Sequence, residues 1–244
     1  MVSDEDLIRD DQPLLVLLQS AEPADIHDLV SFMTDNGKGR LAMASEVRNT
    51  LVAARNANQY SRGELVLLIR ELQHFGGNSV VNLVRRNGVP YAEIVSDVLR
   101  YVGGEAHGNE VAALELQVLD KLVRKQWSKM SEQERAAFAR QYGNASGFAQ
   151  LNLETLLASF RLDAGSAARL ASAVGSCITP LMFEGALSWG ATAVASRFAG
   201  LALGPLATAA GIQSAASEAY RVTVPCVAHI AYIRLKHLAR LSAE

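Results

Sequence analysis

Apolar residues recur at every third or fourth position through most of residues 1–142, which is the spacing of an α-helix with one buried face. The first clear example follows Pro23, a residue that suits the first turn of a helix. Its apolar positions are Ile26, Leu29, Val30 and Met33. No segment shows sustained polar–apolar alternation with the β-branched enrichment of a strand. The pattern therefore predicts an all-α fold, a multi-helix bundle. The expected helices include residues 23–33, 41–56, 65–75, 78–86, 91–102, 110–127 and 135–142.

Residues that begin and end helices stand at the boundaries of these segments. Ser61–Glu64 and Ser131–Glu134 both match the capping box, in which a serine and a glutamate three residues later satisfy each other's backbone N–H groups. The glycine-containing pairs at 36–37, 76–77 and 103–104 are typical helix stops. The sequence also predicts Asn78 and Asn109 as N-caps and Pro90 as a helix start.

The composition changes near Ala164. Only five of the 70 residues from Ala164 to Ile233 are charged, whereas the other 174 residues carry 43 charges. The longest uncharged stretch, Phe198–Ser217, has 20 residues, which is long enough for a helix to span a bilayer core. The sequence therefore predicts an amphipathic helical body over residues 1–163. It also predicts that residues 164–244 form a second unit, an Ala/Gly-rich helical hairpin that packs on the body or associates with a membrane.

Small side chains line one face of this apolar stretch. Gly200 and Gly204 form a GxxxG step, and Ala207 and Gly211 continue the row, so two helix backbones can approach closely there. These four residues are candidate helix–helix or membrane contacts. Two interpretations stay open, a glycine-packed hairpin inside a protein core and a membrane-associated segment, because Ala and Gly add little transfer free energy. The uncharged residues 222–233 are too few to span alone and favour a core helix or a re-entrant hairpin.

The charge distribution excludes some partners. The formal net charge is −2, which gives no overall basic field for nucleic acid. The acidic N-terminus lacks the basic and then apolar pattern of a secretory signal, so we expect a cytoplasmic protein, peripheral to or conditionally inserted into the inner membrane. Two basic clusters remain to be assigned. Lys121, Arg124, Lys125 and Lys129 form a stripe that could contact phosphate or an acidic partner, or remain a solvated face. Arg234, Lys236 and Arg240 suit an anionic membrane surface or an ordinary helix C-terminus.

Candidate chemistry is sparse. Glu71 and His74 lie three residues apart on one helix face, as in the Glu-x-x-His pairs of di-iron bundles, but a di-iron site needs a second such pair and none occurs. We therefore expect a structural histidine, and a metal protein or enzyme built on this pair is the less favoured alternative. Cys177 and Cys226 stand in apolar surroundings and suggest inert thiols. No catalytic signature or cofactor motif is present, so the sequence predicts no cofactor and a non-enzymatic protein.

Several blocks of the sequence resemble an uncharacterised bacterial family of the YaaW type. The strongest are ELQHFGGNSVVNLVRRNGVPYAEIVSDV (71–98) and SEAYRVTVPCVAHIAYIRL (217–235), with weaker support from residues 28–49 and 126–135. The resemblance implies a helical protein with a glycine-rich C-terminal segment and supplies no activity. The resemblance also marks several residues as candidate signature positions. Their expected roles are structural: to end a helix, to form a double-glycine turn and, for the proline, to limit the last helix. These positions are Glu71, His74, Gly76, Gly77, Tyr220, Arg221 and Pro225.

The middle of this family is also similar to the ubiquinol–cytochrome c chaperone domain, which implies a chaperone-like role. The leading hypothesis is therefore a non-enzymatic helical binding protein, chaperone-like or membrane-associated through its C-terminal glycine-rich hairpin. Its expected partners are a protein client or a membrane surface, with a homo-oligomer as a further form, and not nucleic acid. The alternative is a membrane-permeabilising factor of the pore-forming type, in which the row from Gly200 to Gly211 drives oligomerisation.

Overall fold

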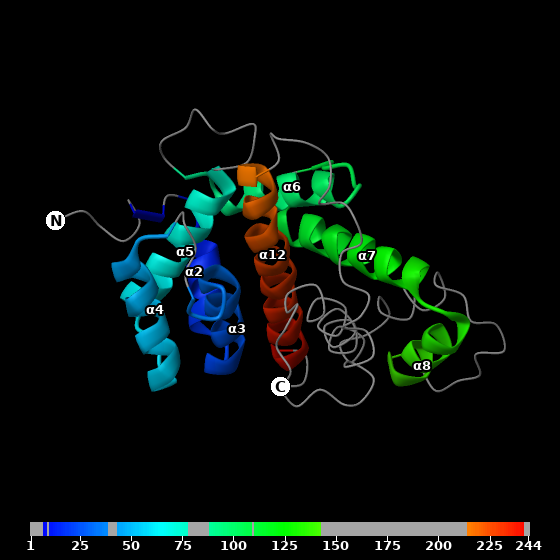
Figure 1. Ribbon diagram of the computed structural model, residues 1–244, viewed down its shortest axis with the longest axis horizontal. Helices are drawn as coiled ribbons and strands as arrows, with labels where there is room; N and C mark the ends of the chain where they lie inside the picture. The colour runs from blue at the N-terminus through cyan, green and yellow to red at the C-terminus, as the bar shows by residue number, and fades with distance from the viewer. Residues whose placement is uncertain are drawn as a thin grey trace.

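The computed structural model describes residues 7–8, 10–38, 43–77, 88–108, 110–142 and 214–241. Within these ranges the chain is all-α, which confirms the predicted fold class, and no strand occurs in them. Figure 1 shows the arrangement of the helices. They are α2 (Gln12–Gln19), α3 (Pro23–Thr34), α4 (Ser45–Ala57), α5 (Arg62–Gly77), α6 (Tyr91–Tyr101), α7 (Val111–Lys129), α8 (Glu132–Tyr142) and α12 (Ser214–Leu241).

Both predicted capping boxes are formed. At the start of α5, the Ser61 N–H donates to Glu64 Oε2 at 2.6 Å and the Glu64 N–H donates to Ser61 Oγ at 3.4 Å. At the start of α8, the Ser131 N–H donates to Glu134 Oε2 at 2.7 Å, and the Glu134 N–H returns the contact at 3.3 Å. The bond from the Ser131 backbone also lowers the pKa of the Glu134 carboxyl. Local sequence therefore fixes where these two helices begin.

Other helix boundaries agree with the sequence or shift by a few residues. Helix α3 begins at Pro23 and ends in a left-handed turn, with φ of 50° at Asp35, 56° at Asn36 and 88° at Gly37. Helix α4 begins four residues later than the predicted position 41. Helix α7 has Glu110 at its N-cap, one residue after the predicted cap. The predicted helix at 78–86 lies outside the described residues.

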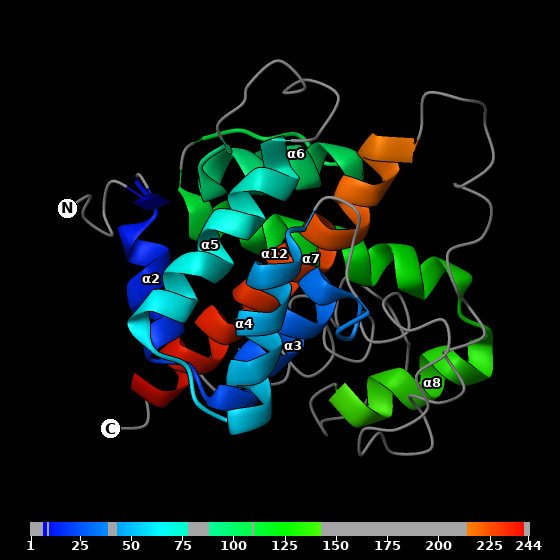
Figure 2. The same cartoon turned by 60° about the vertical axis from the view of Figure 1, so that its left-hand side comes forward.

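Helix α12 lies at the centre of the bundle, although it comes last in the chain. It contacts α2, α3, α5, α6 and α7. In Figure 1, α2 to α5 lie on one side of α12 and α7 on the other, and α6 crosses near its N-terminal end; Figure 2 shows the same bundle from a second side. Helix α8 follows α7 away from this bundle. The C-terminal helix is therefore the element around which the described helices assemble.

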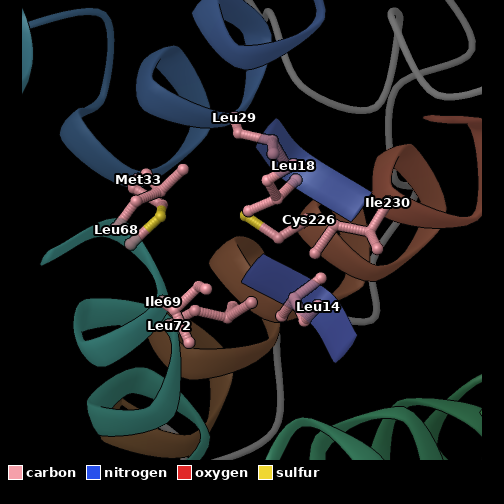
Figure 3. Close-up of a pocket in the computed structure, with 9 residues that line it drawn as sticks. All are labelled: Leu14, Leu18, Leu29, Met33, Leu68, Ile69, Leu72, Cys226 and Ile230. Atoms are coloured by element: carbon pink, nitrogen blue, oxygen red, sulfur yellow. The ribbon is translucent and has the colours of Figure 1, made fainter. Parts of the chain in front are cut away.

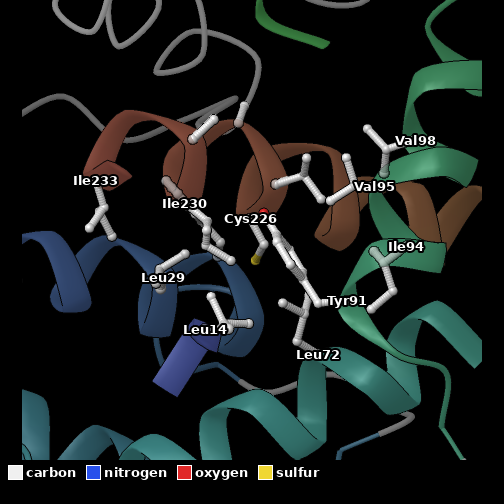
Figure 4. Packing of buried hydrophobic residues seen from close by; sticks show 14 of the residues in the cluster. Leu14, Leu29, Leu72, Tyr91, Ile94, Val95, Val98, Cys226, Ile230 and Ile233 are labelled. Atoms are coloured by element: carbon white, nitrogen blue, oxygen red, sulfur yellow. The ribbon is translucent and has the colours of Figure 1, made fainter. Parts of the chain in front are cut away.

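The core is built mainly of aliphatic side chains that meet α12 from several helices. Figure 4 shows Leu14, Leu29, Leu72 and Ile94 around Cys226, Ile230 and Ile233. Between Val222 and Ile233 every residue is buried except Val224 and Tyr232, which are half-buried. This confirms the interpretation of the uncharged residues 222–233 as a core helix, and it confirms that the thiol of Cys226 is buried.

The expectation that Pro225 limits the last helix is wrong. Pro225 lies inside α12 and is buried, and the helix continues to Leu241. Proline removes one backbone donor and costs about 3 kcal/mol in a helix interior. The helix persists because the residues on both sides of Pro225 are packed against five other helices, and that burial outweighs the local cost.

The structure describes only part of the predicted second unit, residues 164–244. The boundary at residues 163 and 164, Cys177 and the four candidate contacts Gly200, Gly204, Ala207 and Gly211 lie outside the described residues. Residues 214–241, the end of the second unit, form α12 and share the core of the first. No helix in the described ranges is both long and apolar enough to cross a membrane.

Candidate functional site

A buried ion pair joins α7 to α12. The Glu115 side chain is 1% exposed, and its carboxylate accepts two hydrogen bonds from Arg234, from Nε at 2.6 Å and from Nη2 at 3.1 Å. Tyr91 at the start of α6 donates its hydroxyl to Glu115 Oε1 at 2.9 Å. Burial and then the charge of Glu115 raise the pKa of Tyr91 well above its usual range, which keeps the phenol protonated as a donor. A bidentate contact and a third donor are what a buried carboxylate requires.

A second buried carboxylate continues this network toward the N-terminus. The backbone N–H of Tyr91 donates to Asp11, 2.9 Å from Oδ2 and 3.1 Å from Oδ1. Gln73 Nε2 on α5 donates to Asp11 Oδ2 at 2.7 Å and to the Ile8 carbonyl at 2.8 Å. Asp11 thus caps α6 from a distant part of the chain, where a negative charge is favoured by the helix dipole. The network connects the starts of α2 and α6 with α5, α7 and α12.

A partly exposed ionic cluster fixes the other end of α12 to α3. Lys236 Nζ contacts Glu22 Oε2 at 2.5 Å and the two Asp25 oxygens at 2.9 and 3.1 Å, and Arg240 also pairs with Glu22. The hydrogen bond from Lys236 lowers the pKa of Glu22. Burial alone would lower the pKa of Lys236, but its bonds to the two carboxylates raise it. The C-terminal basic residues are therefore neutralised within the protein, as at an ordinary helix C-terminus.

His229 lies beside this cluster in the α3–α12 interface. Its Nε2 is 2.9 Å from the Asp25 carbonyl, which can only accept, so Nε2 carries the proton. The same atom is 3.9 Å from Asp28 Oδ2, and the ring stacks on Tyr232 with centroids 5.3 Å apart. Burial lowers the pKa of His229, which favours the neutral ring.

Glu71 and His74 share a face of α5, as predicted, but do not form a metal site in the described part of the chain. Glu71 is buried, half of the His74 side chain is exposed, and Glu71 Oε1 lies 3.7 Å from His74 Nδ1. No group of three or more metal-ligating side chains occurs among the described residues. The metal or enzyme alternative gains no support from this part of the molecule.

The signature positions Gly76 and Gly77 lie on α5, and Tyr220 and Arg221 lie on α12. A Cβ added to Gly76 would lie 2.5 Å from Ile94 Cγ1 and 2.9 Å from Val89 Cγ2, so only glycine lets α5 pass the start of α6 this closely. Gly77 is the last described residue of α5, and the residues after it lie outside the described part of the chain, so its role as a helix stop stays a prediction. Tyr220 stacks on Tyr101 of α6, with ring centroids 3.9 Å apart. Arg221 is exposed on α12.

Two small cavities accompany these contacts. The first has a volume of about 10 Å³ and only apolar lining, and Figure 3 shows Cys226 and Met33 among its nine residues. The second, of about 30 Å³, lies between α7 and α12 beside Glu115 and Arg234. Both are far smaller than pockets that hold small-molecule ligands, which reach several hundred Å³. They are packing defects rather than substrate sites.

The buried network was missed by the sequence analysis. One indication was present: Glu115 lies in the helical register of Val118, Leu119 and Leu122, all of which are buried, so a charge at that position needs a partner. The identity of that partner could not be read from the sequence, because Arg234 is 119 residues away.

Comparison with known proteins identifies the family. The chain is 30% identical over 226 residues to the UPF0174 protein YaaW of Escherichia coli strain K12, an alignment that covers 90% of this chain and 92% of that protein. The chain belongs to the UPF0174 family. A UPF0174 protein of Helicobacter pylori is 33% identical over 189 residues, which are 71% of this chain and 88% of the relative. The predicted resemblance to the YaaW type is thus confirmed.

These UPF0174 relatives carry no activity in their names. Comparison with protein-family models gives no match, and comparison with solved structures gives none either. The similarity to the ubiquinol–cytochrome c chaperone domain therefore stays a prediction from the sequence.

Proposed function

We propose that this UPF0174 protein is a non-enzymatic helical binding protein that uses its Ala/Gly-rich C-terminal segment to contact an apolar surface, either a protein client or a membrane. The observation that carries this proposal is the fixed position of α12. That helix is buried in the bundle and is ion-paired to α7 through Arg234 and to α3 through Lys236. The described helices form a well-packed body without a substrate-sized pocket among the cavities described above.

The buried position of α12 argues against this helix as the part of the second unit that binds an apolar surface. Release of α12 would expose its buried aliphatic residues and separate the Glu115–Arg234 pair, which is costly on both counts. We therefore propose that binding through the second unit uses residues 164–213, which precede α12 in the chain. Conditional membrane association remains compatible with this assignment. The uncharged stretch 198–217 has only five Leu, Ile or Phe residues, each worth a few tenths of a kcal/mol at a helix centre, so its partition between protein and lipid is close to balance.

The proposal is tested by replacing residues 164–213 with a Gly/Ser linker of equal length, which keeps α12 in the chain. We expect the full chain to float with liposomes, or to suppress aggregation of a heat-unfolded model protein, and the linker variant to lose that activity. Circular dichroism and a cooperative unfolding transition serve as controls that the body still folds. Equal behaviour of both chains in both assays would contradict the proposal.

The membrane-permeabilising alternative is supported by the row of small residues at Gly200, Gly204, Ala207 and Gly211. It predicts dye leakage from vesicles by the full chain and loss of leakage in Gly204→Leu, because a leucine would separate the packed helices. Ala202→Leu adds the same side chain away from this row and should leave leakage intact. Absence of leakage by the unmodified chain would rule this alternative out.

A further inference from the structure

We draw no further inference here: the strongest candidate, the small apolar groove between α7 and α12 that the exposed side chains of Leu116 and Leu238 line, carries nothing, because no observation in the described part of the structure shows what covers it.

Discussion

At the scale of single residues, Glu115 is the clearest case of a side chain whose position depends on distant partners. Its carboxylate is almost fully buried and is satisfied by Arg234 and by the Tyr91 hydroxyl. Desolvation of such a charge costs several kcal/mol, and only well-oriented donors offset it. The pair therefore specifies how α7 and α12 meet more than it adds to the net free energy of folding.

Replacement of Glu115 by Gln should destabilise the protein by about 3 kcal/mol, because the Arg234 guanidinium is left without its counterion. This loss of stability is at the low end of the range for breaking a buried ion pair, because a quarter of the Arg234 side chain remains exposed to water. Equilibrium urea unfolding measures the change. Glu105→Gln, in the largely exposed contact with His107, is the control and should change stability by less than about 0.5 kcal/mol. Similar effects of the two variants would contradict this role of the buried pair.

Gly76 supports a second prediction at this scale. Gly76→Ala should cost about 1–3 kcal/mol, because its Cβ would overlap Ile94 and Val89 and force α5 and α6 apart. Gly63→Ala in the same helix is the matched control: its Cβ would meet nothing closer than Ser61 Oγ at 3.8 Å, so the gain in helix propensity should leave stability unchanged or raised by up to about 1 kcal/mol. Thermal unfolding of both variants measures the change in stability. If Gly76→Ala were as stable as the unmodified protein, α5 and α6 could separate at no cost.

At the scale of elements, the contact of α3 with α12 combines a partly exposed ionic cluster and a buried neutral histidine. Glu22 and Asp25 hold Lys236, while His229 donates to the Asp25 carbonyl and faces Asp28, Tyr232 and Lys236. Because burial lowers the pKa of His229 in the folded protein, the unfolded chain binds its proton more readily. Stability is therefore expected to fall as the pH decreases below the ordinary histidine pKa of about 6.5.

The corresponding test compares unfolding at about pH 7 and about pH 5. The unmodified protein should lose stability over this interval, and His229→Gln should lose less, because glutamine keeps a donor but does not titrate. His107→Gln removes a histidine whose side chain is 81% exposed and should retain the full decrease. If the stability of His229→Gln and that of the unmodified protein decreased equally between these pH values, the pH dependence would come from other groups.

Element boundaries show how far local sequence determines this structure. The capping boxes at Ser61 and Ser131 and the turn after Thr34 were predictable because their donors and acceptors are neighbours in the chain. The interior position of Pro225 was not, because its cost is met by packing from helices distant in sequence. Periodicity thus predicted most of the described helices but not α2, and it could not predict the non-local partners that let α12 continue through a proline.

At the scale of the whole molecule, the last described helix, α12, packs in the centre of the bundle and completes its core. The sequence suggested a division at residue 164, from composition alone, and composition does not reveal which apolar residues pack together. Residues 222–233 contain no Asp, Glu, Lys or Arg, and they lie in the core with α2, α3, α5, α6 and α7.

The central position of α12 leads to a prediction about truncation. A chain that ends at residue 213 should lack a cooperative unfolding transition, because it loses five large aliphatic side chains buried in α12, each worth about 1.5–3 kcal/mol. These residues are Val222, Val227, Ile230, Ile233 and Leu235. Their sum, on the order of 10 kcal/mol, is comparable with the whole unfolding free energy of a typical domain. A chain that ends at Leu241 keeps every one of these contacts and should unfold like the full chain. Urea titrations followed by circular dichroism compare the two, and a cooperative transition in the shorter chain would mean that residues 1–213 fold without the helix that now lies between α3 and α7.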